Sequence, residues 1–129
     1  MTKSIIMNIN GMNEFYNILQ KNDGVVIFKF GAEWCSPCKK IESFVTNWFN
    51  SIHTNPDITN IQLVYIDVDE SFELYAQLKT KKMIQGIPAI LAYYKGNETI
   101  IVDNYVSGTN ENSIDIFFNN CINKAKTLL

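Results

Sequence analysis

The feature that most constrains the fold is an apolar run that leads directly to two closely spaced cysteines. Residues 25–30, Val-Val-Ile-Phe-Lys-Phe, are β-branched or aromatic except for Lys29. So few polar members are typical of a strand that is covered on both faces of a sheet. Cys35 and Cys38 follow, and apolar residues then recur at helical spacing. The pattern predicts a central strand followed by a helix over residues 35–52.

The rest of the chain alternates short strands and helices before it turns antiparallel. Further strands are expected at residues 5–9, 61–68, 89–94 and 99–102, and further helices at residues 13–21, 70–83 and 112–126. Asn10 or Asn13 is expected to cap the first of these helices. The turn Lys95-Gly96-Asn97 predicts a hairpin between the last two strands. This order predicts an α/β fold, with a mixed central sheet of about five strands between layers of about four helices.

Length and composition exclude several classes of protein. The chain has 129 residues, 47% of them hydrophobic, which is enough for one core, and we expect residues 1–129 to form a single domain. Charges are interspersed and sum to -2, so no nucleic-acid partner is expected. No apolar run is long enough to span a membrane, and the amino terminus lacks a signal-peptide pattern. We expect a soluble, cytoplasmic monomer, or a protein of the host cytoplasm or virion if its source is viral.

Cys35 and Cys38 are the candidate catalytic residues. At the first turn of a helix, both sulfurs lie near unpaired backbone N–H groups and the positive end of the helix dipole, which stabilise a thiolate. Cys35 is expected to be the more exposed, attacking sulfur, and Cys38, one turn deeper, to resolve the mixed disulfide. Ser36 and Pro37 form the turn between them, where a proline is tolerated because its missing N–H would have no intrahelical partner.

Other interpretations of the cysteines are weaker. One pair supplies two of the four ligands of a zinc site, and the only histidine, His53, lies elsewhere without metal-ligand spacing, so no metal is expected. A buried structural pair is the remaining alternative, although adjacent cysteines in a reducing compartment are more often catalytic or metal-binding than structural. Cys121 stands alone on the inward face of the last predicted helix, as a core cysteine or, alternatively, as a regulatory or dimer-forming thiol.

A resemblance to a known family rests on two motifs that occur in order. Residues 25–39, which include Trp34-Cys35-Ser36-Pro37-Cys38, resemble the central strand and active-site helix of thioredoxins. Gly86-Ile87-Pro88 resembles a second signature of that family, whose proline is cis and faces the cysteines. The resemblance covers nearly the whole chain and implies the thioredoxin fold, ending in an antiparallel hairpin and a C-terminal helix. It also implies that Pro88 is cis.

The resemblance further implies a thiol–disulfide oxidoreductase that reduces protein disulfides by dithiol–disulfide exchange. The nucleophile would be Cys35, the resolving thiol Cys38, and the supporting residues Trp34, Ser36, Pro37, Lys29 and Pro88. An extended substrate segment would bind at Trp34, Gly86, Ile87 and Pro88, although Trp34 could instead serve only in packing. No bound cofactor is required, because a thioredoxin reductase or a glutathione-type reductant would recycle the disulfide. An oxidase or isomerase, and a thioredoxin-fold binding or structural protein with little turnover, stay open as alternatives.

Lys29 departs from the family pattern. Thioredoxins usually have a buried aspartate at this position, where it helps exchange the proton of the second cysteine, and Tyr65 and Gly31 replace two further family residues, a lysine and a tryptophan. A buried lysine could relay a proton, or, if charged, stabilise nearby thiolates. We hypothesise that Lys29 makes the couple more oxidising. Alternatively, its side chain snorkels to the surface or pairs with one of three carboxylates, Glu33, Asp67 or Asp69.

Overall fold

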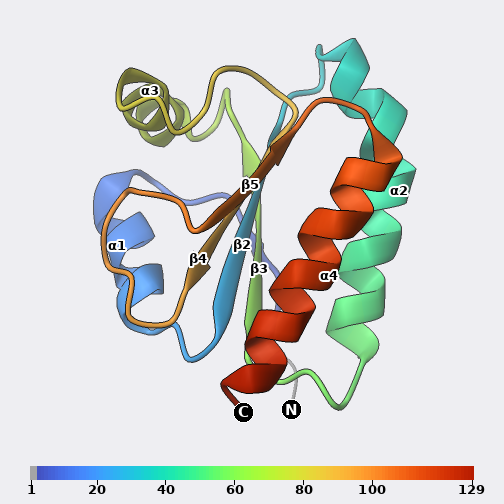
Figure 1. The fold of residues 1–129 in the computed structure, drawn as a ribbon. Helices are drawn as coiled ribbons and strands as arrows, with labels where there is room; N and C mark the ends of the chain where they lie inside the picture. The colour runs from blue at the N-terminus through green and yellow to red at the C-terminus, as the bar shows by residue number, and fades with distance from the viewer. Residues whose placement is uncertain (1–2) are drawn as a thin grey trace.

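A computed structural model describes residues 3–129 as a five-stranded sheet between two pairs of helices (Figure 1). Residues 1–2 lie outside the described residues. They are part of the amino-terminal segment in which the sequence shows no signal-peptide pattern. The elements are β1 (Ile6–Met7), α1 (Met12–Gln20), β2 (Val25–Gly31), α2 (Ser36–Thr54), β3 (Ile61–Asp67), α3 (Phe72–Thr80), β4 (Ala89–Tyr94), β5 (Asn104–Ser107) and α4 (Glu111–Thr127). The predicted mixed α/β architecture is therefore confirmed. No helix within residues 3–129 has the length and apolar character needed to cross a membrane.

The sheet is mixed and has β2 at its centre. Its strand order is β1-β3-β2-β4-β5, in which β1, β3 and β2 are parallel and β4 and β5 are antiparallel to their neighbours. All seven residues of β2 are buried, as its apolar run predicts. The register places Lys29 of β2 between Tyr65 of β3 and Ile90 of β4. The chain's most buried strand thus contains a lysine.

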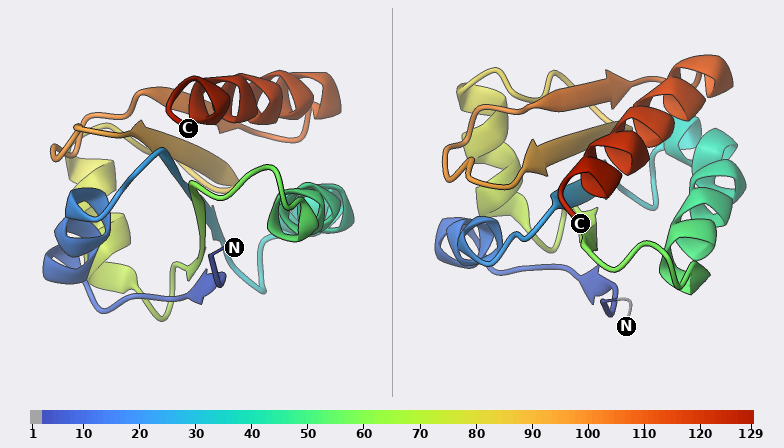
Figure 2. Two further views of the ribbon diagram at one scale, coloured as in Figure 1. Left: turned by 90° about the horizontal axis from the view of Figure 1, so that it is seen from below. Right: turned by 60° about the horizontal axis from the view of Figure 1, so that its bottom comes forward.

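Each face of the sheet is covered by one pair of helices. Helices α2 and α4 lie on one side and α1 and α3 on the other (Figures 1 and 2). Val25 and Ile27 pack into the core cluster under α2 and α4, whereas Val26, Phe28 and Phe30 pack into the cluster under α1 and α3. Successive side chains of a strand point to opposite faces. By this alternation the Lys29 side chain extends towards the α2 layer, where the cysteines lie.

The predicted position of the hairpin's second strand is wrong. It was expected at residues 99–102, but β5 lies further along the chain, and residues 95–103 form a loop. A side chain stabilises this loop, because Asp103 Oδ2 accepts the Tyr94 N–H at 2.7 Å. Ile100 and Val102 pack against the core under α1 and α3. Their apolar character therefore reflects loop packing and not strand pairing.

Other predicted boundaries need smaller corrections. Strand β1 is shorter than the expected residues 5–9, and α1 follows Gly11 with no side-chain cap from Asn10 or Asn13. Helix α3 is shorter than the expected residues 70–83. It stops because Lys82 adopts a left-handed φ of 64° and the Met83 N–H bonds to the Leu78 carbonyl at 2.9 Å. Such a backbone reversal is a common helix terminus.

Candidate redox site

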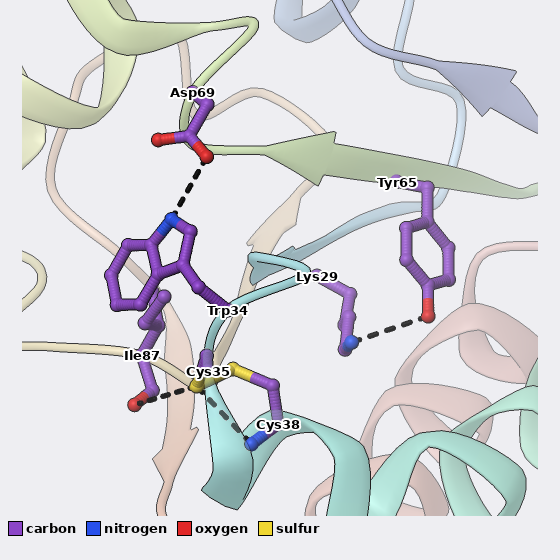
Figure 3. The surroundings of a disulfide bond; sticks show 7 residues. All are labelled: Lys29, Trp34, Cys35, Cys38, Tyr65, Asp69 and Ile87. Carbon is purple, nitrogen blue, oxygen red and sulfur yellow. Dashed lines mark hydrogen bonds between the residues drawn. A yellow bond between two sulfur atoms is a disulfide. The ribbon is translucent and has the colours of Figure 1, made fainter.

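Cys35 and Cys38 form a disulfide at the start of α2 (Figure 3). Cys35 is the N-cap of the helix, and its Sγ accepts the backbone N–H of Cys38 at 3.2 Å. Pro37 lies in the first turn, where no intrahelical N–H is lost. A backbone donor and the positive end of the helix dipole thus both act on the Cys35 sulfur. In the reduced protein this arrangement stabilises a thiolate at Cys35.

The two cysteines are equally buried as whole residues but face different parts of the protein. Each residue is 4% exposed in the disulfide form, so the greater exposure expected for Cys35 is not seen in this state. Cys35 Sγ lies 3.8 Å from the Ile87 carbonyl oxygen, at the loop that precedes β4. Cys38 instead lines a cavity together with Lys29. Cys35 therefore faces the Gly86–Pro88 loop, and Cys38 faces the interior.

The loop beside Cys35 contains the second sequence motif. The Ile87–Pro88 peptide bond is cis. Pro88 is buried, and its carbonyl accepts the Gly108 N–H at 3.2 Å, whereas Gly86 and Ile87 are half-buried. The structure thus brings this motif, which is about fifty residues away in sequence, next to the disulfide (Figure 3).

Trp34 forms an exposed wall of the site. Its side chain is 67% exposed, and its indole N–H donates to Asp69 Oδ2 at 2.8 Å (Figure 3). Sequence reasoning considered Asp69 only as a partner of Lys29 and missed this contact. The available signal was position, because Asp69 follows β3 as Trp34 follows β2, and parallel strands end at the same edge of a sheet. The bond holds a large apolar ring beside Cys35.

Lys29 is buried, and its ammonium group bonds to a tyrosine. Its side chain is 3% exposed, its Nζ donates to Tyr65 Oη at 3.2 Å, and it lies 4.7 Å from the Tyr65 ring centroid. Among residues 3–129, no carboxylate oxygen lies within 4.0 Å of this Nζ.

Both alternatives for Lys29, a snorkelling side chain and an ion pair with Glu33, Asp67 or Asp69, are therefore wrong. The strand alternation directs the side chain towards α2, while Asp69 is bound to Trp34 and Asp67 Oδ1 accepts the Asp69 N–H.

A cavity of about 320 Å³ opens beside Cys38. Lys29 and Tyr65 contribute to its wall, and Gly31 contributes no side chain that would fill it. Its other titratable lining residues are Glu33, Lys39, Glu42 and Asp67. The second cysteine thus has a space next to it that a solvent molecule can enter.

The remaining candidate ligands and thiols are not part of this site. Residues 3–129 contain no cluster of three or more His, Cys, Asp or Glu side chains that could hold a metal ion. His53 lies in the last turn of α2, at the opposite end of the helix from the disulfide, and its Nδ1 is 3.1 Å from the Lys3 carbonyl oxygen. Cys121 is fully buried on α4, and burial raises the pKa of its thiol to about 12. It is a core cysteine.

The chain is similar to known proteins in both sequence and fold. The sequence matches the family described as Thioredoxin over residues 6–120. It is 30% identical to thioredoxin 3 of Plasmodium falciparum over 122 residues, which cover 94% of this chain but 61% of that protein's length. It is 34% identical to putative thioredoxin-4 of Dictyostelium discoideum over 96 residues, 74% of this chain and 81% of that protein. The solution structure of oxidised thioredoxin from Plasmodium falciparum has a similar fold, with a TM-score of 0.63 at 24% identity, covering 92% of this chain and 99% of that one.

Proposed function

We propose, from the premise that this chain belongs to the thioredoxin family, that it reduces disulfide bonds in protein substrates. Members of this family are dithiol–disulfide oxidoreductases, and the Cys35–Cys38 pair is the corresponding redox centre. The observation that carries the proposal is the Cys35 N-cap, whose sulfur accepts the Cys38 N–H at 3.2 Å. A sulfur stabilised as an anion in this way is a nucleophile at neutral pH.

The proposed reaction has two exchange steps. The Cys35 thiolate attacks a substrate disulfide, so a Cys35–substrate S–S bond forms, the substrate bond breaks, and the first substrate thiolate leaves and takes a proton from solvent. Cys38, deprotonated, then attacks Cys35 Sγ, which forms the disulfide seen here and releases the second substrate thiolate. The substrate gains two electrons and the protein loses them. The short Cα–Cα distance of 5.3 Å between the cysteines supports the second step.

We propose that substrate binds as an extended segment across Trp34 and the Gly86–Pro88 loop. The half-buried backbone of Gly86 and Ile87 lies beside Cys35 and leads into β4, so a substrate strand could pair with it. The exposed Trp34 ring offers an apolar contact on the other side. These positions support Trp34, Gly86, Ile87 and Pro88 as the substrate-binding residues, and Ser36 and Pro37 as the residues that set the turn between the sulfurs.

An external reductant must return the disulfide to the dithiol. Family membership implies disulfide-containing protein substrates and a reductase partner in general. We propose that a thioredoxin reductase or a glutathione-type thiol supplies the electrons. We further propose that the protein works as a monomer in a reducing compartment such as the cytoplasm.

Reduction of insulin disulfides tests this function. With dithiothreitol as the electron source, we expect the protein to accelerate precipitation of the insulin B chain and the Cys35→Ser variant to lose the acceleration. Cys121→Ser is the matched control, because Cys121 is buried on α4, and we expect it to retain the rate. A wild-type rate equal to that of dithiothreitol alone would contradict the reductase. If the protein instead accelerated the oxidative refolding of a reduced substrate protein, that result would favour the oxidase or isomerase.

A further inference from the structure

The buried charge of Lys29 lies close to the sulfur of the resolving cysteine. A Cβ added at Gly31 would lie 3.1 Å from Lys29 Nζ and 3.6 Å from Cys38 Sγ. The two atoms are therefore no further apart than the sum of these distances, 6.7 Å. Figure 3 shows the lysine side chain between the disulfide and Tyr65. Because residue 31 is glycine, this position places no side chain between the ammonium group and the sulfur.

The bonding of Lys29 leaves its charge available to Cys38. An ammonium group has three N–H donors, and the structure gives one of them to Tyr65 Oη, a neutral acceptor on β3. No carboxylate within 4.0 Å neutralises the charge among residues 3–129. A desolvated cation of this kind gains most from an anion that forms nearby. The Cys38 thiolate, which the resolving step requires, is such an anion.

Other charged groups around Cys38 are less well placed. Glu33 follows β2, and Lys39 and Glu42 lie on α2, and all three line the cavity with exposed side chains. Asp67, at the end of β3, is half-buried, and its Oδ1 accepts the Asp69 N–H. Water screens exposed charges strongly, so their effect on the sulfur is small. Lys29 is the buried charge that faces it.

We propose that Lys29 is a positioning residue that stabilises the Cys38 thiolate and thereby makes this dithiol–disulfide couple more oxidising. The inference rests on the proposed function. Reduction of the disulfide breaks the S–S bond and takes two electrons from the reductant, for example from two glutathione thiols that become one disulfide. When Cys38 remains a thiolate, the reduction takes up one proton fewer than when Cys38 is protonated. The charge of Lys29 favours this reduced state over the disulfide, which raises the reduction potential.

Equilibrium with glutathione tests the proposal in the full chain. Lys29→Met removes the charge and keeps an unbranched side chain, and Lys29→Gln removes the charge and can still bond to Tyr65 Oη. We expect the GSH²/GSSG ratio at half-oxidation to change about tenfold in both variants, towards a more reducing couple, which is about 30 mV. The matched control is Lys39→Met, which removes an exposed charge from the same cavity and should leave the ratio unchanged. An unchanged ratio in the folded Lys29 variants would overturn the proposal, as would an equal change in the control.

A titration of the lone Cys38 thiol separates an electrostatic role from a structural one. In the Cys35→Ser background, thiolate absorbance reports ionisation of Cys38, since Cys121 is buried. We expect Lys29→Met to move this ionisation to higher pH by about one unit, the equivalent of a tenfold change. Superimposable curves would overturn the proposal. Insulin reduction by the wild type is an independent readout, so a failed potential test with normal insulin turnover refutes this inference alone.

Discussion

Replacing Lys29 by methionine should change the stability of the reduced and oxidised proteins by different amounts. In the reduced protein the ammonium group attracts the Cys38 thiolate, whereas in the oxidised protein no anion is present at the sulfur. At the maximum separation of 6.7 Å, Coulomb's law gives about 2.5 kcal/mol at an effective dielectric constant of about 20. Water in the adjoining cavity screens the pair, so we expect a smaller difference of about 1.4 kcal/mol, which equals a tenfold change in the redox equilibrium.

The sign of the stability change in the oxidised and in the reduced protein follows from the cost of removing the ammonium group from water. Burial of an ammonium group costs several kcal/mol, which the bond to Tyr65 Oη and the contact with its ring offset in part. Methionine removes this cost in the oxidised protein, so we expect oxidised Lys29→Met to be at least as stable as the oxidised wild type. In the reduced protein the lost attraction to the thiolate opposes that gain.

Urea unfolding of both redox forms measures the difference. Wild type and Lys29→Met are unfolded in the oxidised form and in the presence of excess phosphine reductant, with fluorescence and far-UV circular dichroism as probes. The unfolded chains expose residue 29 to water in both forms, so their contributions cancel in the double difference. Equal stability changes in the oxidised and reduced forms would refute the reasoning, because the effect of the substitution would then not depend on the charge of the Cys38 sulfur.

Three further predictions concern the wall of the site, the core thiol and the sheet. Trp34→Ala should lower kcat/KM for insulin about fivefold while changing the free energy of unfolding by less than about 0.5 kcal/mol, because the ring is 67% exposed; unchanged kinetics would exclude it from substrate binding. Burial raises the pKa of Cys121 from 9.0 to about 12, so the folded protein keeps a proton that the unfolded chain loses, and stability falls between these pH values. Urea unfolding across that interval should show a smaller loss for Cys121→Ala, and parallel curves would contradict this. Gly24→Ala should cost about 3 kcal/mol or more in urea unfolding, since the new Cβ would lie 2.2 Å from the Asn60 carbonyl oxygen; a cost below about 1 kcal/mol would show that the β2–β3 edge can move apart.

The centre of the fold could be predicted because its signals are local and strong. Residues 25–30 are apolar except for Lys29, and only a strand covered on both faces buries every member of such a run. Cys35-Ser36-Pro37-Cys38 follows at the distance needed for a turn, and Pro37 suits the first turn of a helix. The structure places the cysteines where these patterns put them.

Other features depend on contacts that a sequence does not reveal. Residues 99–102 have strand-like composition, but Ile100 and Val102 fill space under a loop, while β5 has only one buried residue, Val106. Likewise, the surroundings of Lys29 follow from the register with Tyr65 and from the bond between Trp34 and Asp69, which takes away one possible carboxylate partner. Which partner each of these side chains bonds to depends on the folded arrangement and cannot be read from the sequence.

The most direct measurement is the identification of the cysteine that captures a substrate. Cys38→Ser protein is reduced, mixed with a disulfide-linked peptide, quenched with acid and mapped by mass spectrometry. We expect a stable mixed disulfide on Cys35 and none on Cys121, whereas the Cys35→Ser variant should give no comparable adduct. Capture of the peptide by Cys38 at an equal rate, or absence of any adduct on Cys35, would contradict the assignment of Cys35 as the nucleophile.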